Sequence, residues 1–362
     1  MSHGDREASY LFYAGSYADS AEPGIYLCEL DRRTGELRAI HGTDGIANPS
    51  FVIVDQEMLR LYAVSEQTAG QVAGYAIDPA SGRLSRLGTE TPTLGADPCH
   101  LALRPGPERH LLAANYSSGH LNVYALGPDG ALREMTGLVR HEGGSVNKER
   151  QESAHAHSIV PSRDGNFAFV SDLGTDQIVA YRLEAGKLAR QGAVNLPPGA
   201  GPRHFVIHPS QRFAYGMNEL NNTMTAYAFD PADGRLEAVQ HIGSLPDDYD
   251  GENYPADIHL SPDGRYVYGS NRGHDSIVRF RVDPDNGRLD EPAWTGTGGS
   301  WPRNFAVLED YVIVANQYSG NIVALRRDAE TGLLEPAGRS LAIGKPSCIE
   351  PLGTAVAAGI AR

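Results

Sequence analysis

The chain has 362 residues, which suits two or three ordinary domains or one large all-β domain with a sizeable core. Glycine (41 residues) and proline (23 residues) are frequent, but their share stays below that of low-complexity sequence, which argues against disorder. The formal net charge of −14, with no cluster of Lys and Arg, argues against nucleic acid and anionic membranes as partners.

The first segment, residues 1–8, is polar, and we expect it to be flexible. It lacks the apolar core of a signal peptide, and no apolar run in the chain approaches the roughly 18 residues that a membrane-spanning helix needs. The cysteines Cys28, Cys99 and Cys348 are odd in number and far apart, which fits neither a disulfide framework nor a CxxC pair. We therefore expect a cytoplasmic protein with reduced thiols.

The first repeated element, which we call the B strand, is an apolar strand that ends in a small or polar residue. It occurs at LFYAGSY (11–17) and again at LYAVSE, LLAANY, FAFVSD, FAYGMNE, YVYGSNR and YVIVANQ. After each copy, a turn with the pattern Gly-x-Leu separates two further strands, C and D, which predicts a β-hairpin. These glycines recur at intervals of roughly 45 to 56 residues, the length of a propeller blade. They are Gly35, Gly82, Gly130, Gly186, Gly234, Gly287 and Gly332.

The remaining repeated element, the A strand, precedes every B strand except the first. Its copies are NPSFVIV, DPCHLAL, HAHSIVP, GPRHFVI, YPADIHL, WPRNFAV and KPSCIEP. The chain therefore begins with a B strand and ends with an A strand. We predict an all-β fold, a single seven-bladed β-propeller over residues 9–352 with four antiparallel strands per blade. The N-terminal strands would close the ring by pairing with the C-terminal A strand. Residues 353–362 are expected to form a C-terminal tail.

In this geometry the A strands line the central channel, and the starts of the A strands and the ends of the B strands meet at one funnel-shaped face. Residues that break the repeat at the funnel are candidate functional residues. Near the starts of A strands these are His157, Arg203 and Arg303, and at the ends of B strands they are Glu219 and Arg272. The Asn, Asp and Ser residues that recur at B-strand ends are expected only to cap turns.

The funnel arginines suggest an anionic small-molecule ligand, because guanidinium presents a planar fork of donors to carboxylate or phosphate. A surface salt bridge is the alternative for any one of them. Glu219 is either a general acid or base or the counter-ion of an arginine. His155 and His157 alternate along one A strand, so only one of them should face the channel if that strand is regular.

Two connections, residues 141–154 and 244–254, are longer than ordinary loops and should enter the funnel face. In the first, Asn147, Arg150 and Gln151 are candidate substrate-binding or lid residues, and a solvated loop is the alternative. The acidic run at 247–252 lacks the spacing of an EF-hand and is expected to be solvated surface.

Several short motifs, AGSY, NPSF, RQESAHAH, GPRH, MNEL, SNRGHDS and WPRNF, occur together between about Tyr10 and Leu352. In combination they resemble the seven-bladed propeller lactonase family, which includes bacterial 6-phosphogluconolactonases and a fungal carboxymuconate lactonizing enzyme. The resemblance implies that the family's active-site histidine falls on His155 or His157. It further places the two arginines on Arg203 and Arg272, and the glutamate on Glu219.

The sequence lacks the G-x-S-x-G, H-E-x-x-H and P-loop motifs, so we expect water as the nucleophile. We expect neither a cofactor nor an essential metal, although Glu66, Asn115, Asp172 and Asn218 offer oxygen ligands for a channel Ca²⁺.

The favoured hypothesis is hydrolysis of a sugar lactone such as 6-phosphogluconolactone, in the pentose phosphate pathway. Glu219 or a funnel histidine would be the general base, and cationic groups would stabilise the oxyanion. The alternatives are a carboxymuconate-type cycloisomerase and a non-catalytic propeller that binds a small anion or a protein. The sequence leaves the oligomeric state open.

Overall fold

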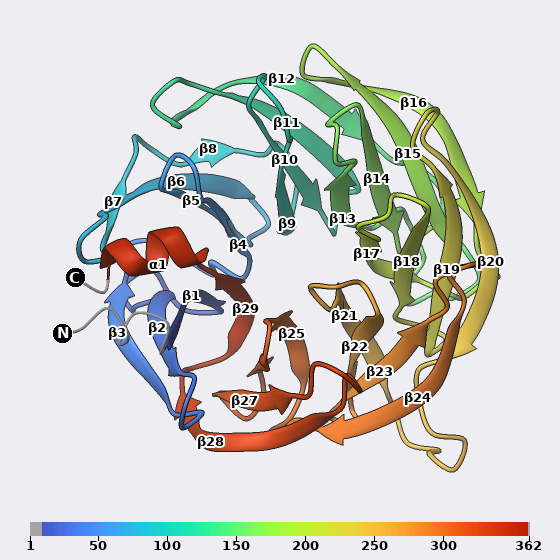
Figure 1. Ribbon diagram of the computed structural model, residues 1–362. Coiled ribbons are helices and arrows are strands. Elements are labelled where there is room, and N and C mark those ends of the chain that lie inside the picture. The colour runs from blue at the N-terminus through green and yellow to red at the C-terminus, as the bar shows by residue number, and fades with distance from the viewer. Residues whose placement is uncertain (1–8, 361–362) are drawn as a thin grey trace.

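The computed structural model describes residues 9–360, in which seven antiparallel sheets stand like blades around a central channel (Figure 1). The predicted flexible segment 1–8 lies outside the described residues. No helix in the described part of the chain is long and apolar enough to cross a membrane.

The blades are numbered here in ring order, and their strands run from the channel outward. Blade 1 contains β29 (Pro346–Pro351), β1 (Ser9–Ser16), β2 (Ile25–Asp31) and β3 (Leu37–Thr43). Blade 2 contains β4 (Val52–Asp55), β5 (Arg60–Ser65) and β6 (Gln71–Ile77), with β7 (Leu84–Arg86) and β8 (Thr91–Pro92) both paired to β6. Blade 3 contains β9 (Pro98–Leu103), β10 (His110–Asn115), β11 (His120–Leu126) and β12 (Leu132–Arg140).

Blade 4 contains β13 (Ala156–Pro161), β14 (Phe167–Asp172), β15 (Gln177–Glu184) and β16 (Lys187–Asn195). Blade 5 contains β17 (Pro202–Ile207), β18 (Phe213–Asn218), β19 (Thr223–Asp230) and β20 (Arg235–Gly243). Blade 6 contains β21 (Tyr254–Leu260), β22 (Tyr266–Arg272), β23 (Ser276–Val282) and β24 (Leu289–Gly296). Blade 7 contains β25 (Pro302–Val307), β26 (Tyr311–Asn316), β27 (Asn321–Arg327) and β28 (Leu334–Ala342).

The ring closes as predicted. The C-terminal strand β29 pairs antiparallel with the N-terminal strand β1, with Tyr13 opposite Glu350 and Gly15 opposite Cys348. In Figure 1 the blue and red ends of the chain accordingly share one blade. Closure leaves no blade without its inner strand, and it covers the edge that β1 would otherwise expose.

The hydrophobic core lies between neighbouring blades rather than at the centre of the ring. Met217 and Met224 of blade 5, for example, pack in one buried cluster with Val267 and Val278 of blade 6. The second strand of a blade is covered on both sides, and β10, β14, β18 and β26 are buried at every residue. This explains why B strands are nearly continuous apolar runs in the sequence.

The predicted hairpins are confirmed at their glycines. All seven Gly-x-Leu glycines have positive φ values, between 67° and 77°, which glycine adopts without the steric cost that other residues meet. Several of these hairpins also pack closely on the preceding blade. A Cβ on Gly234 would lie 2.5 Å from the ring of Phe167, and one on Gly287 would lie 2.3 Å from Phe213.

Two local features differ from the simple repeat. The outer strand of blade 2 is broken into β7 and β8 around Gly88, whose φ of 73° interrupts the extended backbone. The C-terminal segment, expected only as a tail, contains helix α1 (Thr354–Ile360), and its residues Val356, Ala357 and Ile360 pack against the core of blades 1 and 2.

Candidate active site

A β-bulge at the start of several inner strands turns consecutive side chains toward the channel. The register between β17 and β18 shifts at Arg203, and that between β25 and β26 shifts at Arg303. In a β-bulge, two residues of one strand lie opposite a single residue of its partner, which changes the direction in which the side chains of the bulged strand point. As a result Arg203 and His204, and likewise Arg303 and Asn304, line the same cavity on the channel floor.

Glu219, directly after β18, is a buried carboxylate on which three arginines converge. Its Oε2 lies 3.0 Å from Nε of Arg203 and 2.7 Å from Nη2 of Arg272, and its Oε1 forms an ion pair with Arg150. The predicted convergence of Arg203, Arg272 and Glu219 is therefore confirmed. Burial raises the pKa of Glu219, but Arg272, Arg203 and Arg150 outweigh burial and lower that pKa to about 2. A carboxylate this acidic is ionised at neutral pH and is a weak proton acceptor.

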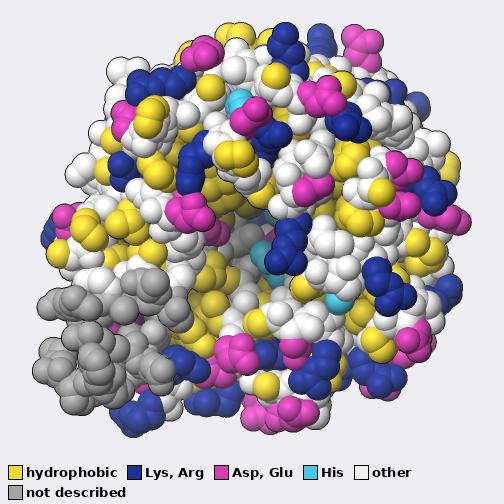
Figure 2. Space-filling model, turned by 45° about the horizontal axis from the view of Figure 1, so that its top comes forward, with side chains coloured by type: hydrophobic (Ala, Val, Ile, Leu, Met, Phe, Trp, Pro, Cys, Tyr) yellow, Lys and Arg dark blue, Asp and Glu magenta, His cyan; other side chains and the backbone are white. Residues whose placement is uncertain are grey.

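The funnel has more cations than carboxylates. Burial, together with Arg272 and Arg303, lowers the pKa of Arg203 to about 9. Within residues 9–360, Arg303 has no hydrogen bond or ion pair, and its guanidinium lies 5.3 Å from the ring centroid of Tyr17. The Tyr17 hydroxyl donates to the second funnel carboxylate, Glu66, at 2.9 Å. The centre of the ring is hollowed, and basic and histidine side chains gather there (Figure 2).

His155 and His157 are both buried, but neither ring combines a free nitrogen with a carboxylate that orients it. Nδ1 of His155 lies 3.1 Å from the carbonyl oxygen of Tyr116 and its Nε2 lies 3.1 Å from Glu152, so both nitrogens face acceptors. His157 has Nδ1 3.8 Å from Sγ of Cys99 and no carboxylate partner within the described chain. Burial, reinforced by Arg203, lowers the pKa of His157 well below its usual value.

The long connection 141–154 presents one of its three predicted residues to the site. Arg150 reaches Glu219, and its Nη2 also donates to the Tyr116 hydroxyl at 3.3 Å. Asn147 accepts hydrogen bonds from two backbone amides of the loop, and Gln151 donates to Asp176 at 2.7 Å. Asn147 and Gln151 therefore brace the loop that carries Arg150 and do not join the arginine cluster.

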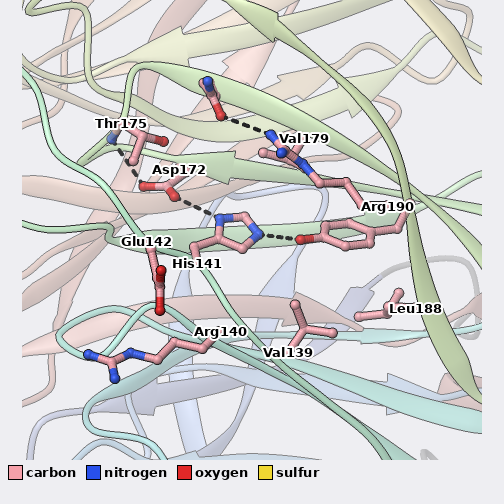
Figure 3. A pocket seen from close by; sticks show the side chains of 11 residues that line it. Val139, Arg140, His141, Glu142, Asp172, Thr175, Val179, Leu188 and Arg190 are labelled. Carbon is pink, nitrogen blue, oxygen red and sulfur yellow. Dashed lines mark hydrogen bonds and ion pairs between the residues drawn. The ribbon is translucent and has the colours of Figure 1, made fainter.

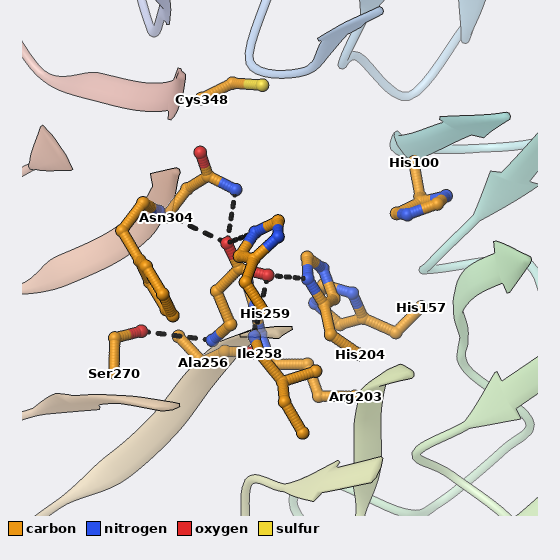
Figure 4. A network of polar contacts seen from close by, with 12 residues as sticks. His100, His157, Arg203, His204, Ala256, Ile258, His259, Ser270, Asn304 and Cys348 are labelled. Atoms are coloured by element: carbon orange, nitrogen blue, oxygen red, sulfur yellow. Dashed lines mark hydrogen bonds and ion pairs between the residues drawn. The ribbon is translucent and has the colours of Figure 1, made fainter. Parts of the chain in front are cut away.

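Asp257 in β21 is the centre of a polar network that was not predicted from the sequence. Its partners His204, His259 and Asn304 are labelled in Figure 4. Its Oδ1 accepts from Nδ1 of His204 at 2.6 Å, and its Oδ2 accepts from Nε2 of His259 at 2.9 Å and from Nδ2 of Asn304 at 2.6 Å. The backbone amides of Ile258 and Phe305 also donate to this carboxylate. The two histidines and their donated hydrogen bonds hold the pKa of Asp257 well below its usual value despite burial, which opposes this.

A sequence signal for this network exists at the fourth residue of each A-strand motif. An apolar residue is expected there if side chains alternate along a regular strand, yet this position holds His100, His204, Asp257 and Asn304 in four blades. Polar residues at a position that is expected to be apolar therefore indicate a polar network beside the channel. Regular alternation predicts that only the third residue faces the channel, and the bulge that also turns the fourth residue toward it arises from strand pairing.

The recurring polar residues at B-strand ends stabilise blades, as expected. Asn115 donates to Asn122 at 2.7 Å, Asn218 donates to Thr225 at 2.9 Å, and Asp172 accepts from backbone amides that follow β14. These side chains were weighed as oxygen ligands for a metal ion. The amide nitrogens of Asn115 and Asn218 donate within their own blades, whereas their Oδ1 atoms are buried without a hydrogen-bond partner among the described residues. Asp172 also pairs with His141 from the connection after blade 3.

A separate pocket of about 340 Å³ lies between the outer strands of blades 3 and 4 (Figure 3). In it Nδ1 of His141 donates to Asp172 at 2.7 Å, and its Nε2 accepts from the hydroxyl of Tyr181 at 2.7 Å. Both imidazole nitrogens are thus engaged within the fold. The arrangement ties the loop after β12 to blade 4 and leaves no ring nitrogen for chemistry.

Aromatic side chains flank the arginines at the mouth of the funnel. Trp301 stacks on Tyr318 with ring centroids 4.5 Å apart, and Arg272 lies 5.2 Å from the centroid of Trp301. Trp301 has a φ of 67°, an unusual value for a bulky residue, and the equivalent residues Asn48, Asp97, Gly201 and Lys345 of four other blades also have positive φ. The positive φ therefore belongs to the blade repeat, whereas a bulky aromatic side chain in this conformation occurs at this position only in blade 7 among the described blades.

The chain is similar to known lactonases over nearly its whole length. Residues 11–351 match the family model described as "Lactonase, 7-bladed beta-propeller". The chain is 34% identical over 344 residues to a 6-phosphogluconolactonase of Bacillus subtilis, covering 94% of this chain and 98% of that protein. It is 33% identical over 351 residues to a 6-phosphogluconolactonase of Formosa agariphila, covering 93% and 98%. The structure of the periplasmic gluconolactonase of Pseudomonas aeruginosa matches with a TM-score of 0.89 at 31% identity, covering 96% and 99% of the two chains.

Proposed function

Because the chain belongs to the lactonase family of seven-bladed β-propellers and is therefore a lactone hydrolase, we propose that it hydrolyses 6-phospho-glucono-1,5-lactone to 6-phosphogluconate. The names of the Bacillus and Formosa relatives support this substrate. The reaction is a carboxylic ester hydrolysis with water as the nucleophile.

The observation that carries the proposal is the convergence of Arg150, Arg203, Arg272 and Arg303 on the funnel. These four guanidinium groups lie near three carboxylates, Glu219, Glu66 and Asp257, so the site still has an excess of positive charge. A phosphate monoester carries close to two negative charges at neutral pH and offers oxygen acceptors that match the guanidinium fork. An uncharged lactone would leave this charge uncompensated.

The arginines divide between two tasks. Arg203 and Arg272, fixed by Glu219, stabilise the negative charge that develops on the lactone carbonyl oxygen. Arg303 and Arg150 bind the phosphate group. Arg150 comes from the surface loop and is one-third exposed, so it exchanges Glu219 for the substrate when the substrate enters. Asn147 and Gln151 act on the substrate through Arg150, because they hold the loop in shape.

Trp301 supports the placement of the sugar ring. Its indole lies beside Arg272 at the funnel mouth, and an aromatic face provides apolar contact for the C–H side of a pyranose lactone. The general base is a histidine at the funnel floor rather than Glu219, because Glu219 is held ionised by three arginines with a pKa of about 2.

We place the enzyme in the cytoplasm. The three cysteines are free thiols, all of them buried, which fits a reducing compartment. The Pseudomonas neighbour is called periplasmic, so the fold itself does not decide the compartment.

The test is a comparison of initial rates on freshly generated 6-phosphogluconolactone, unphosphorylated gluconolactone and carboxymuconate. We expect kcat/KM for the phosphorylated lactone to exceed that for gluconolactone by about 10- to 100-fold, because a charge-assisted hydrogen bond contributes about 1.5–3 kcal/mol. Equal rates on the two lactones would contradict a phosphate site. Cyclisation of carboxymuconate without lactone hydrolysis would favour the lactonizing alternative.

A further inference from the structure

His204 differs from the other histidines of the funnel floor in how its ring is held. Its Nδ1 donates to Asp257 at 2.6 Å, and no described residue hydrogen-bonds its Nε2. His155 has both ring nitrogens turned to acceptors, and His157 has no carboxylate to orient it. His204 alone among these three combines an oriented ring with a free nitrogen, which is the geometry of a general base and its orienting carboxylate.

Asp257 is fixed strongly enough to set the tautomer of His204. Its carboxylate accepts from His204, His259 and Asn304 and from two backbone amides, so it is ionised and cannot rotate freely. An ionised carboxylate only accepts, so the proton on His204 must reside on Nδ1. The lone pair of the neutral ring is therefore on Nε2, on the edge of the ring that is turned away from Asp257.

A small cavity lies beside His204. Its volume is about 10 Å³, close to the least space that holds one water molecule. Arg203, Arg303, Glu66 and the Ser50 and Cys99 side chains share its lining with His204. The proton acceptor His204, the cationic groups of Arg203 and Arg303, and space for one water molecule therefore lie together where the bulged strand β17 meets the channel.

We propose that His204 is the general base that activates the hydrolytic water in this cavity, and that Asp257 is its positioning residue. The inference rests on the proposed lactone hydrolysis and goes beyond it by naming the proton-transfer group. In the first step the water oxygen bonds to the lactone carbonyl carbon while one water proton passes to Nε2 of His204. The carbonyl π pair moves to the oxygen, where Arg203 and Arg272 stabilise it.

In the second step the tetrahedral intermediate collapses. The carbonyl reforms, the ring C–O bond breaks, and Nε2–H of His204 returns its proton to the departing alkoxide oxygen. The product is a hydroxy acid, which releases its acid proton to solvent at neutral pH. One water is consumed, His204 ends neutral, and no oxidant or reductant takes part.

The protonation of His204 gives the proposal a pH signature. Burial, followed by Arg203, lowers the pKa of His204 to about 4, while Asp257 opposes this, so the ring is neutral at pH 7. The titratable and charged groups that face it are His100, His157, Arg203, Arg303, Asp257, His259, Glu66 and Cys99. Because Glu219 titrates at about pH 2, the arginine cluster stays intact while His204 is protonated. The parent should therefore lose kcat/KM as the pH falls through about 4.

The test uses His204→Gln, which keeps a donor for Asp257 but cannot accept a proton. We expect kcat to fall by about 10²- to 10⁴-fold with KM within a few-fold of the parent, and the acidic limb of the pH profile to disappear. His208→Gln is the matched control, because His208 follows the same strand and bonds only to Ser210 and Gly264 outside the channel. It should keep the parent kinetics.

Asp257→Asn tests the positioning role. We expect a loss of kcat of similar order, and the double variant with His204→Gln should be little worse than either single one, because the two residues act as a unit. A melting temperature close to that of the parent would show that the loss of kcat in Asp257→Asn is not caused by misfolding. Parent-like kcat in His204→Gln, with a loss in His157→Gln instead, would overturn the inference and leave lactone hydrolysis standing. Absence of turnover by the parent on every lactone would overturn both.

Discussion

Among the described residues, Arg303 is a partly buried funnel arginine without a hydrogen bond or ion pair, which makes it the group best placed to bind the substrate phosphate. Arg303→Lys keeps the charge but loses the planar fork. We expect KM for 6-phosphogluconolactone to rise about 10-fold or more, since a charge-assisted hydrogen bond contributes about 1.5–3 kcal/mol, and KM for gluconolactone to change much less. Steady-state kinetics on both lactones measures this.

The control for Arg303 is Arg326→Lys, an exposed arginine in β27 of the same blade. It should leave both KM values unchanged. An equal rise of KM for the two lactones in Arg303→Lys would show that this arginine contacts the lactone ring and not the phosphate.

Glu219 is expected to act chiefly as the counter-ion of Arg203 and Arg272. Its pKa is lowered from 4.5 to about 2, so it stabilises the fold above pH 4.5, and this contribution of about 3 kcal/mol is lost as the pH falls toward 2. We expect Glu219→Gln to lower the free energy of unfolding at pH 7 by about 3 kcal/mol and to weaken the acid dependence between pH 4.5 and 2. Denaturant unfolding of parent and variant across this range tests it.

The same variant separates the two interpretations of Glu219. Other buried carboxylates with lowered pKa values, such as Asp257 and Asp172, are common to parent and variant and cancel in the comparison. If Glu219 were the general base, kcat would fall by about 10²- to 10⁴-fold even where the variant is as stable as the parent. Unchanged stability with such a loss of kcat would contradict the counter-ion role.

At the scale of single residues, the sequence predicted the arginines and Glu219 of the funnel better than His204 and Asp257 on the funnel floor. Arg203, Arg272 and Glu219 stood out because they break a repeat, and their contacts are confirmed. His204 and Asp257 did not, because strict alternation along a strand turns the residue after Arg203 away from the channel. The bulge that reverses this depends on the pairing of two strands.

At the scale of elements, a tyrosine in the second strand of several blades forms a hydrogen bond to the hairpin of the next blade. The hydroxyls of Tyr13, Tyr62, Tyr215 and Tyr268 donate to the carbonyls of Gly82, Gly130, Gly287 and Gly332. The donor and the turn that receives it are both buried. These bonds therefore help set the angle between neighbouring blades.

Tyr215→Phe removes one of these bonds and leaves a buried carbonyl without its donor. We expect a loss of about 1–2 kcal/mol in the free energy of unfolding and no change in kcat, because Tyr215 bonds Gly287 far from the funnel. Tyr26→Phe is the control, since its hydroxyl bonds Pro23 in an exposed turn, and it should cost less than about 0.5 kcal/mol. Equal effects in chemical denaturation would show that the contact between blades contributes nothing specific.

The hairpins could be predicted because their determinants are local. A Gly-x-Leu turn requires positive φ at glycine wherever it occurs, and all seven follow the prediction. Helix α1 was missed for the opposite reason. Its segment contains Gly359 and follows Gly353, which weakens any helix signal, and packing of Val356 and Ile360 on the finished core supplies its stability.

At the scale of the whole molecule, the repeat register determines how the ring is closed. A chain that starts with a B strand must recover its missing A strand from the other end, and β29 provides it. The same strand places Ser347 in the lining of the channel cavity. It also places Cys348 in the core of blades 1 and 2. We propose that residues 9–352 form one domain whose stability depends on this closure.

Removal of residues 345–362 tests that dependence. It deletes β29, exposes the inner edge of β1, and removes Cys348 and Leu352 from their buried cluster. Net stability of a domain is only about 5–15 kcal/mol, so the loss of an entire inner strand should destabilise all seven blades and not blade 1 alone. We expect the truncated chain to melt far below the parent, with lactonase activity lost.

The matched control removes only residues 353–362, which deletes α1 but keeps β29 paired with β1. Since Val356, Ala357 and Ile360 are only partly buried, this shorter truncation should lower the melting temperature modestly and keep activity. Hydrogen exchange in β18, on the far side of the ring from β29, reports whether the damage spreads. Parent-like protection of β18 together with a parent-like melting temperature after removal of 345–362 would show that the blades fold independently, because closure would then contribute nothing to their stability.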